Sequence, residues 1–364
     1  MRNSLGDFVT VTLFGESHGE AIGAILDGLP AGITVNENFI SECLSLRRPA
    51  DANSTSRIEA DNFKIVSGVY TGKTTGTPIC LLIPNSKFHS SDYSQIDGIA
   101  RPGHADYTAF CKYHGYEDRR GGGHFSGRIT AALVAVGAIA ISALEEKGIK
   151  IGTHISRLAG IDDRSFNDIE NDVSYLSSLK FPVLNDITAE KMKSAIQAAK
   201  SKGDSVGGTL ETFVIGLPAG VGEPWFDSIE GKLSNAMFSI PGIKGVSFGD
   251  GFEICDMNGS AANDPFYYDG EKIVTLKNSN GGINGGITNG MPIIFKCAVK
   301  PTPSISIKQN TVDFINNRNC DIEIKGRHDP CIVHRAASVV KAITALVFCD
   351  ILTGKFGSDY LLSK

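Results

Sequence analysis

The chain has 364 residues, of which 41% are hydrophobic and 21% are charged, and its formal net charge is −5. Length alone suggests about two domains, and the composition is typical of a globular protein with a large core. An acidic chain argues against a nucleic-acid-binding protein, because such proteins carry a basic surface. The longest apolar run, residues 131–144, is shorter than the roughly 20 residues that span a bilayer, and the first residues lack the apolar core of a secretory signal. We therefore expect a cytoplasmic protein with no membrane or nucleic-acid partner.

The first strong local pattern is an alternating run at residues 8–14, which predicts a strand and leads into Gly15-Glu-Ser-His-Gly19. This segment satisfies G-x-S-x-G, the nucleophile elbow of serine hydrolases. It also suits a rigid loop that presents a histidine to a ligand, or a plain structural loop. An elbow serine opens a helix after several parallel strands, whereas Ser17 follows one strand and precedes a second strand-like run at residues 24–27. We favour a proton-transfer loop, with a serine hydrolase acting through Ser17 as the alternative.

Two short motifs recur along the chain in the same order. The sequence Gly-Leu-Pro-Ala-Gly stands at residues 28–32 and again at 216–220, and residues 74–79 resemble residues 288–293. No Pro/Ser-rich spacer, charge block or low-complexity segment separates the halves. We expect a single catalytic domain, 1–364, made of two intertwined pseudo-repeats at roughly residues 8–150 and 205–354.

Each half ends in a long apolar helix, predicted at residues 128–147 and about 332–352. Both patterns are apolar around most of the helix circumference, so the helices should be buried on several sides. The strand-like runs, which include 63–70, 79–83, 245–255 and 293–299, can supply the sheets that cover them. The expected fold is therefore α+β, a β-α-β sandwich with long buried helices between antiparallel sheets and an internal pseudo-two-fold duplication.

Basic residues gather before both helices. Residues 101–128 hold Arg101, Arg119, Arg120 and Arg128 together with His104, His114 and His124. Residues 325–335 hold Lys325, Arg327, His328 and Arg335, and a third cluster, Arg47-Arg48-Pro49, stands where a helix should stop. Helix N-termini and arginine forks favour phosphate and carboxylate oxygens. These clusters predict a small substrate with several negative charges and histidines placed for proton transfer. A non-catalytic anion-binding protein is a further alternative.

Three resemblances are discounted. Residues 68–74 are one residue short of a P-loop and are better explained as a strand pair joined by a turn. No G-x-G-x-x-G follows a strand, so a Rossmann dinucleotide site is unsupported. Cys331 and His334 are too few for zinc, and we expect no metal site. The eight cysteines include no C-x-x-C pair, which favours reduced thiols.

Six blocks together resemble the signature blocks of the chorismate synthase family. Residues 14–19, 101–108, 121–128 and 326–331 stand in that family's order, and residues 280–286 and 300–304 resemble two further blocks. The resemblance spans essentially the whole chain. It implies a carbon–oxygen lyase of the shikimate pathway, which makes chorismate by anti-1,4-elimination of phosphate from 5-enolpyruvylshikimate 3-phosphate with reduced FMN as cofactor.

The resemblance also implies residue roles. His18 would protonate or stabilise the reduced flavin, His104 would protonate the leaving phosphate, and Asp329 would help to accept the C6 proton through the flavin N5. Ser17 and Ser126 would be proton relays. The substrate would be held by Arg47, Arg48, Arg101, Arg128 and Arg335. Flavin contacts would fall on His124, Phe125, Ser126, Pro241, Gly242, Gly285, Lys300, Pro301, Thr302, Pro303, Ser304 and Arg327.

A homotetramer is a further expectation that the resemblance carries. Some members of the family reduce their flavin with NADPH and others depend on an external source. Because the chain has no dinucleotide fingerprint and no appended reductase domain, we expect an external flavin-reducing system.

The sequence departs from the family pattern at several positions. His124-Phe125 stands where Arg-Ser is common, and Pro241-Gly242 replaces Asn-Ala. The other departures are Pro303 for a small polar residue, His334 for a small residue or proline, Lys341 for glutamate and Asn53 for a basic residue. These changes gather at the inferred flavin side, whereas the residues expected to transfer protons are intact.

Overall fold

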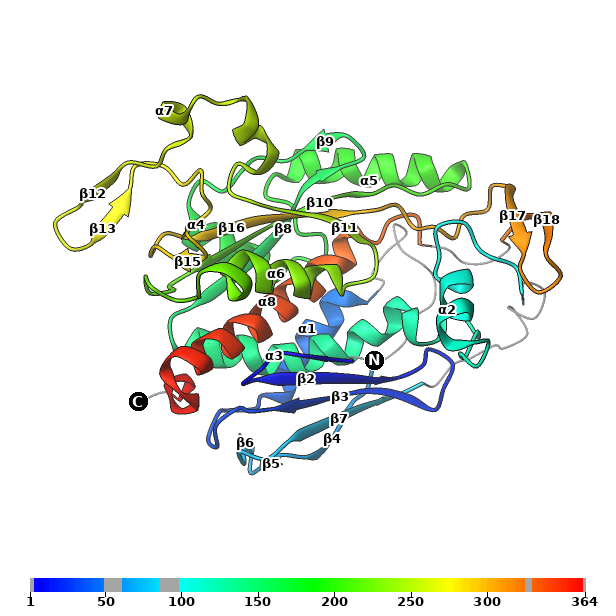
Figure 1. Cartoon of the computed structure of the whole chain (residues 1–364), viewed down its shortest axis with the longest axis horizontal. Coiled ribbons are helices and arrows are strands. Elements are labelled where there is room, and N and C mark those ends of the chain that lie inside the picture. The colour runs from blue at the N-terminus through cyan, green and yellow to red at the C-terminus, as the bar shows by residue number, and fades with distance from the viewer. Residues whose placement is uncertain (1–2, 49–60, 86–97, 325–328, 363–364) are drawn as a thin grey trace.

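The computed structural model describes residues 3–48, 61–85, 98–324 and 329–362 (Figure 1). Two five-stranded antiparallel sheets form its outer layers. In spatial order the first sheet holds β1 (Ser4–Leu5), β2 (Thr10–Gly15), β3 (Ala21–Asp27), β7 (Ile79–Pro84) and β4 (Lys64–Ser67). The second holds β11 (Ile243–Phe248), β16 (Ile293–Val299), β10 (Gly208–Ile215), β8 (Lys150–Leu158) and β9 (Ile161–Asp162).

The remaining strands form two-stranded antiparallel ribbons. They are β5 (Val69–Tyr70) with β6 (Lys73–Thr74), β12 (Phe266–Tyr268) with β13 (Ile273–Thr275), β14 (Ile283–Asn284) with β15 (Ile287–Thr288), and β17 (Gln309–Asp313) with β18 (Arg318–Ile322). The first ribbon confirms that residues 68–74 are a strand pair rather than a P-loop.

The α-helices of the described residues are α1 (Glu37–Arg47), α2 (Asp106–Tyr113), α3 (Thr130–Glu146), α4 (Ile169–Leu176), α5 (Asp186–Ser201), α6 (Ile229–Phe238), α7 (Gly259–Ala262) and α8 (Val333–Phe356). Short 3₁₀ turns cover Gly123–Phe125, Gly127–Ile129, Trp225–Asp227, Gly251–Asp256 and Ser358–Leu361. The mixed helix and sheet content agrees with the expected α+β class.

The two long apolar helices, α3 and α8, lie between the sheets (Figure 1). Helix α3 packs on β3 and β7 of the first sheet, and α8 packs on β8 and β10 of the second. The two helices meet at Gly137, where a methyl group would lie only 2.5 Å from the Cβ of Ala342. Residues 131–141 of α3 are buried without a break, so the prediction of buried helices is confirmed.

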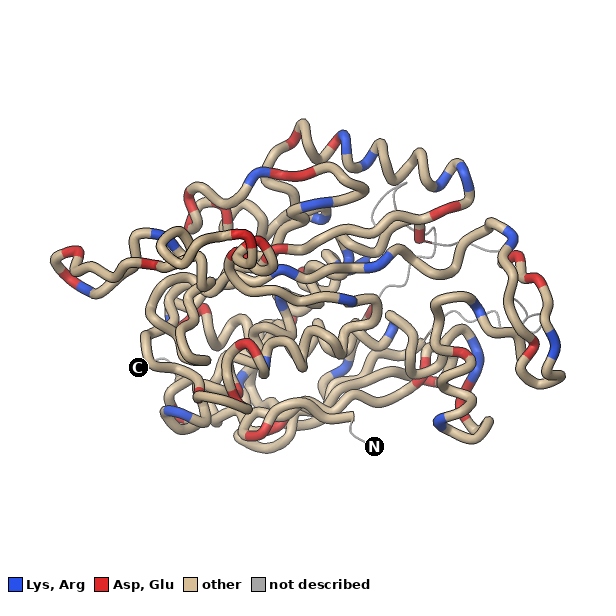
Figure 2. The backbone as a smooth tube through the Cα atoms, turned by 45° about the horizontal axis from the view of Figure 1, so that its top comes forward, with Lys and Arg blue, Asp and Glu red and all other residues tan. Residues whose placement is uncertain are grey.

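By length and composition the segment Gly127–Glu146 and helix α8 also qualify as membrane spans, but 83% and 89% of their apolar windows are buried inside the protein. Figure 2 shows that charged residues follow outer elements such as α5 at the top, while the helices between the sheets carry few. Burial of this kind is typical of core helices, because a helix that is apolar all round must be covered on every side.

The helix and strand ends differ from the sequence predictions in three places. A 3₁₀ turn precedes α3, which therefore begins at Thr130 rather than Arg128. Helix α8 continues through Gly354, which packs against the Phe8 ring, and ends before Gly357, whose φ is 84°. The strand predicted at 245–255 ends at Phe248, because Gly249 has a φ of 55° and turns the chain into a 3₁₀ helix.

The two halves share a strand order and a turn contact. The order β2-β3-β7-β4 in the first sheet corresponds to β8-β10-β16-β11 in the second. Each Leu-Pro-Ala-Gly turn is closed by a buried threonine hydroxyl: Thr74 Oγ1 donates to the carbonyl of Pro30 at 2.6 Å, and Thr288 Oγ1 donates to that of Pro218 at 2.7 Å. The recurrent sequence motifs therefore make the same local structure twice.

Candidate functional site

Ser17 and His18 lie in the connection between the antiparallel strands β2 and β3, and both side chains are buried. Ser17 Oγ lies 3.1 Å from His18 Nδ1 and donates to the carbonyl of Arg120 at 3.3 Å. A nucleophile elbow needs a turn from a parallel strand into a helix. The serine hydrolase alternative is therefore wrong, because strand β3 follows this loop.

A loop of three glycines, Gly121–Gly123, separates His18 from His104. A methyl group on Gly121 would lie 2.1 Å from Cε1 of His18, and one on Gly122 would lie 3.5 Å from Nε2 of His104. All three glycines have positive φ angles, which side chains disfavour. The sequence therefore uses glycine here so that both histidines can approach the same stretch of backbone.

His104 is held by a neighbouring carboxylate. Its Nδ1 lies 2.8 Å from Oδ1 of Asp106. Arg101 donates hydrogen bonds to the same carboxylate from Nε at 2.8 Å and from Nη2 at 2.6 Å. Burial raises the pKa of Asp106, but hydrogen bonds from Arg101 and His104 outweigh it and hold the pKa well below its usual range. Asp106 therefore stays ionised and fixes the ring of His104.

Three arginines converge on one buried carboxylate, that of Asp61, whose side chain is 1% exposed. Arg128 Nη1 donates to Asp61 Oδ1. Arg47 Nη1 and Arg48 Nε lie 3.6 Å and 3.5 Å from Oδ2. Arg47 also donates from Nε to Thr130 Oγ1 at 2.9 Å, so the start of α3 helps to position the cluster.

The second half of the chain joins this cluster through α8. Arg335 Nε donates to the carbonyl of Arg47 at 2.9 Å, and its Nη1 pairs with the carboxylate of Asp329. On the other side, Asn85 accepts from Arg128 Nε at 3.2 Å and donates to the carbonyls of Glu16 and Gly19. A continuous series of contacts therefore links the β2–β3 loop, which holds His18, to Asp329.

A second group of expected residues, those of the flavin side, lies beside the His104 segment. Lys300 Nζ donates to the carbonyl of Gly103, and the backbone amide of Lys300 donates to the carbonyl of Gly242 at 2.9 Å. This backbone contact brings Pro241-Gly242 next to the segment Lys300–Ser304. Burial lowers the pKa of Lys300, and the nearby charge of Lys244 lowers it further. An anion bound near Lys300 would offset both effects.

Further contacts extend this flavin side. A methyl group on Gly103 would lie 3.3 Å from the Cβ of Pro303. The hydroxyl of Thr302 is buried and has no hydrogen-bond partner. His124 Nδ1 lies 2.8 Å from the carbonyl of Gly15, and the Phe125 ring packs edge-on against Tyr113 at 6.1 Å. Ser126 Oγ accepts from the amide of Arg128 at 3.2 Å, which caps the turn before α3.

Not every expected residue joins these groups. Gly285 lies in the turn between β14 and β15, at the end of the molecule away from α2 (Figure 1). Arg327 and the departure Asn53 fall outside the described residues. Sequence reasoning assigned no role to Asp61, Asn85 or Asp106. The role of Asp106 could be predicted from the sequence, because this residue stands two positions after His104 in a basic segment. No local sequence feature indicates a role for Asp61.

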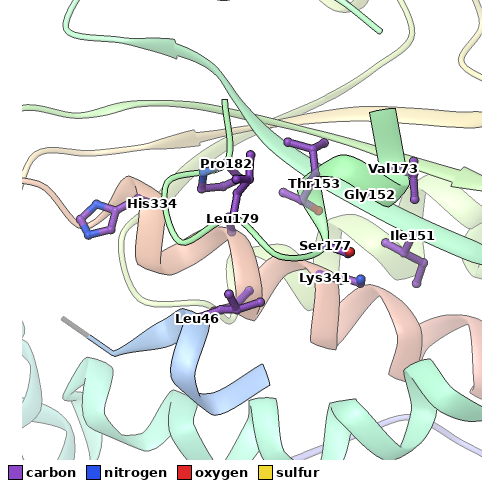
Figure 3. A pocket seen from close by; sticks show the side chains of 13 residues that line it. Leu46, Ile151, Gly152, Thr153, Val173, Ser177, Leu179, Pro182, His334 and Lys341 are labelled. Carbon is purple, nitrogen blue, oxygen red and sulfur yellow. The ribbon is translucent and has the colours of Figure 1, made fainter. Parts of the chain in front are cut away.

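The departures His334 and Lys341 line a small cavity between α8, β8 and the end of α4 (Figure 3). The cavity also touches Leu46, the residue before Arg47. The His334 ring lies 5.7 Å from that of Phe181. These two departures therefore belong to the packing around α8.

Comparison with known proteins decides the family. The family model for chorismate synthase matches residues 9–353. The chain belongs to the chorismate synthase family. A chorismate synthase of Dehalococcoides mccartyi is 47% identical over 355 residues, which cover 96% of each chain. One of Korarchaeum cryptofilum is 45% identical over 93% of each chain. A crystal structure of a chorismate synthase superposes with a TM-score of 0.76 at 31% identity, covering 97% of this chain and 94% of the other.

Family membership gives the chain the activity of chorismate synthase, a carbon–oxygen lyase of the shikimate pathway. The alternative of a non-catalytic anion-binding protein is therefore wrong. Chorismate synthases require a reduced flavin. Among the described residues, no group of three or more histidine, cysteine, aspartate or glutamate side chains is arranged to hold a metal ion.

Proposed function

We propose that this chain eliminates phosphate from 5-enolpyruvylshikimate 3-phosphate in an anti-1,4 sense, giving chorismate, with reduced FMN as cofactor. The observation that carries the proposal is the continuous set of contacts from His18 and His104 through the arginines to Asp329. Five arginines in this set face three carboxylates, so positive charge is in surplus. A surplus of guanidinium groups suits a substrate with one phosphate and two carboxylates.

The substrate-binding residues are Arg47, Arg48, Arg101, Arg128 and Arg335. Four of them contact Asp61 or Asp329, and Arg101 holds Asp106 while also donating to the carbonyl of Gly121 at 3.3 Å. The arginines are therefore held in place before a ligand arrives, which lowers the entropic cost of binding.

Proton transfer is assigned to His104, His18 and Asp329. His104, whose Nδ1 is bound by Asp106, presents Nε2 to the leaving phosphate as a general acid. His18 protonates or stabilises the reduced cofactor, and Asp329 helps to accept the C6 proton. Ser17, hydrogen-bonded to His18, and Ser126 act as proton relays.

The flavin side is supported by two features that fit an anionic cofactor. The buried hydroxyl of Thr302 lacks a partner, and Lys300 lies near the like charge of Lys244. The segment Lys300–Ser304, together with Pro241, Gly242, His124, Phe125 and Ser126, would hold the cofactor. Reduced FMN bound by these residues would supply the electron density that the elimination of phosphate needs. Gly285 and Arg327 remain in the proposed set through the family resemblance alone.

An anaerobic assay tests this function directly. The purified protein is given 5-enolpyruvylshikimate 3-phosphate with reduced FMN, and both chorismate absorbance and phosphate release are followed. Turnover is expected only when reduced FMN is present. Absence of chorismate from a folded protein that receives both ligands would refute the proposal.

The source of reduced flavin is expected to be external, because the sequence contains no dinucleotide fingerprint. With oxidised FMN and no reductase, NADPH should not be consumed. NADPH oxidation that keeps pace with chorismate formation would instead show that the chain reduces its own flavin.

A cytoplasmic homotetramer is proposed as the working form. The ribbon β12–β13 projects from the body of the molecule (Figure 1), and Phe266 and Tyr268 on it are exposed. Trp225 and Phe226 are exposed as well. Exposed aromatic residues in such numbers are typical of protein interfaces. Light scattering after gel filtration should give four times the chain mass.

We also infer that the chain is one catalytic domain, residues 1–364, with a pseudo-two-fold duplication of roughly 8–150 and 205–354 around the helical layer. The common strand order and the paired threonine contacts at Thr74 and Thr288 support this interpretation. A single cooperative unfolding transition is the expected result for such a domain.

A further inference from the structure

Asp61 is the buried carboxylate on which the substrate arginines converge. Arg128 donates to its Oδ1, and Arg47 and Arg48 approach its Oδ2 at 3.6 Å and 3.5 Å. The side chain of Asp61 is 1% exposed, so the negative charge is shielded from water. The three arginines therefore already have an anion among them when no ligand is present.

The fit between Asp61 and these arginines is incomplete. Asp61 Oδ2 and Arg48 Nε are both buried without a hydrogen-bond partner, although they lie only 3.5 Å apart. Leaving such groups unsatisfied costs free energy, since each has lost its water. One carboxylate has two oxygens for three guanidinium groups, whereas a phosphate has at least three acceptors at the same position. The contacts that Asp61 makes can thus be exchanged for better ones.

We propose that Asp61 is an internal counter-ion, which occupies the anion position of Arg47, Arg48 and Arg128 until substrate arrives and competes with the phosphate product for that position afterwards. The inference rests on the proposed function only for the identity of the anion. In the enzyme without substrate, Asp61 occupies the arginines and thereby disfavours the binding of other small anions. After the reaction the same carboxylate returns to the arginines and favours release of inorganic phosphate.

Removal of the charge should make the arginines bind phosphate more tightly. Asp61→Asn keeps the shape of the side chain and removes the competitor. The affinity of the full-length, flavin-free protein for inorganic phosphate, measured by titration calorimetry at low salt, should rise at least tenfold. Asp172→Asn is the matched control. Asp172 is also a buried aspartate paired with an arginine, Arg164 at 2.6 Å, but it lies on the α4 segment and its substitution should leave the phosphate affinity unchanged.

The competition between Asp61 and phosphate should also affect the inhibition of turnover by phosphate. Inorganic phosphate should inhibit chorismate formation by the Asp61→Asn variant at concentrations at least tenfold lower than those that inhibit the wild-type protein. An unchanged or weaker phosphate affinity in a folded Asp61→Asn variant would overturn the proposal.

A second substitution covers the case in which Asp61→Asn does not fold. Asp61→Glu keeps the charge and extends it by one methylene toward the arginines, so it should weaken phosphate binding severalfold. Phosphate affinity equal to or above that of the wild-type protein would then count against the counter-ion role. These binding results stand apart from the proposed function, which fails only if the wild-type protein makes no chorismate in the complete anaerobic assay.

Discussion

The Oδ1 atom of Asp106 lies 2.8 Å from Nδ1 of His104, and Arg101 binds the same carboxylate through two nitrogens. This relationship leaves the other ring nitrogen of His104 facing the glycine loop at Gly122. The ring is thereby oriented by a partner that remains ionised, since its pKa is held far below the usual range. The orientation of the His104 ring is therefore fixed before a ligand binds, as its proposed role as a proton donor requires.

Replacement of His104 by alanine should lower turnover by about 10²–10⁴-fold, the usual contribution of a general acid. Flavin affinity should change little, because the ring is not expected to supply anion binding. Anaerobic turnover and a flavin titration measure the two effects. Near-wild-type turnover by a folded variant that binds both ligands would mean that another group donates the proton.

Asp106→Asn should reduce kcat by about 10- to 100-fold, comparable to the cost of removing the partner that orients a metal-bound histidine. The pH profile should also change, because the fixed negative charge beside the ring is lost. His104→Ala should suppress that change, since no ring would remain to be oriented. A variant with a wild-type kcat and pH profile would show that Asp106 only holds Arg101.

Gly121→Ala should displace His18, because the added methyl group would lie 2.1 Å from Cε1 of the ring and φ at this position is 67°. Turnover should fall to the level of His18→Ala, and the absorbance of bound reduced flavin should shift in the same direction in both variants. Gly259→Ala is the control, since a methyl group there meets no atom within 4 Å. Full activity in Gly121→Ala would contradict the close packing of this loop on His18.

A buried cluster in the second sheet predicts a pH-dependent stability. His154 lies between Glu211, at 3.0 Å from Nε2, and Asp163, at 3.2 Å from Nδ1. Burial lowers the pKa of His154, but the hydrogen bonds that its ring donates to Asp163 and Glu211 outweigh this effect and raise the pKa above its ordinary value of about 6.5. A raised histidine pKa stabilises the fold fully below about pH 6.5, and the contribution is lost as pH rises through the folded-state value.

His154→Gln should therefore destabilise the protein most near pH 6, by about 3–5 kcal/mol, because it removes the cation that two buried carboxylates share. The difference from wild type should shrink as pH rises through the folded-state pKa of His154, because the wild-type ring then also loses its proton. Urea denaturation at several pH values measures the free energy of unfolding. A constant difference over that range would mean that His154 is not charged in the fold.

The α3–α8 contact should tolerate no added volume at Gly137. Alanine is the better helix former by about 1 kcal/mol, but its methyl group would lie 2.5 Å from the Cβ of Ala342 and 2.9 Å from its Cα. We expect Gly137→Ala to destabilise the protein by about 1–3 kcal/mol through overpacking. A stabilised variant in thermal unfolding would show that the two helices can separate at this point.

The sequence by itself determined the family blocks, the two buried helices and the anionic character of the ligand. These features are local. The apolar pattern of residues 131–144, the glycines at 121–123 and the arginines at 47–48 each lie within one short stretch of chain, where neighbouring residues set conformation and burial. The same locality explains why the hydrolase alternative stayed open, because G-x-S-x-G has the same letters in a strand–helix turn and in a β2–β3 loop.

Only the tertiary structure decided which side chains meet. Asp61 joins Arg47 and Arg128, which stand 14 and 67 positions away in the chain, and Arg335 reaches the carbonyl of Arg47 across 288 positions. Such contacts depend on how the two sheets and α8 cross, and no periodicity or spacing encodes the crossing. The same reason separates Gly285, in the turn between β14 and β15, from the other expected flavin residues within one chain. The sequence predicts the local chemistry of each segment, whereas the pairing of buried charges depends on tertiary packing.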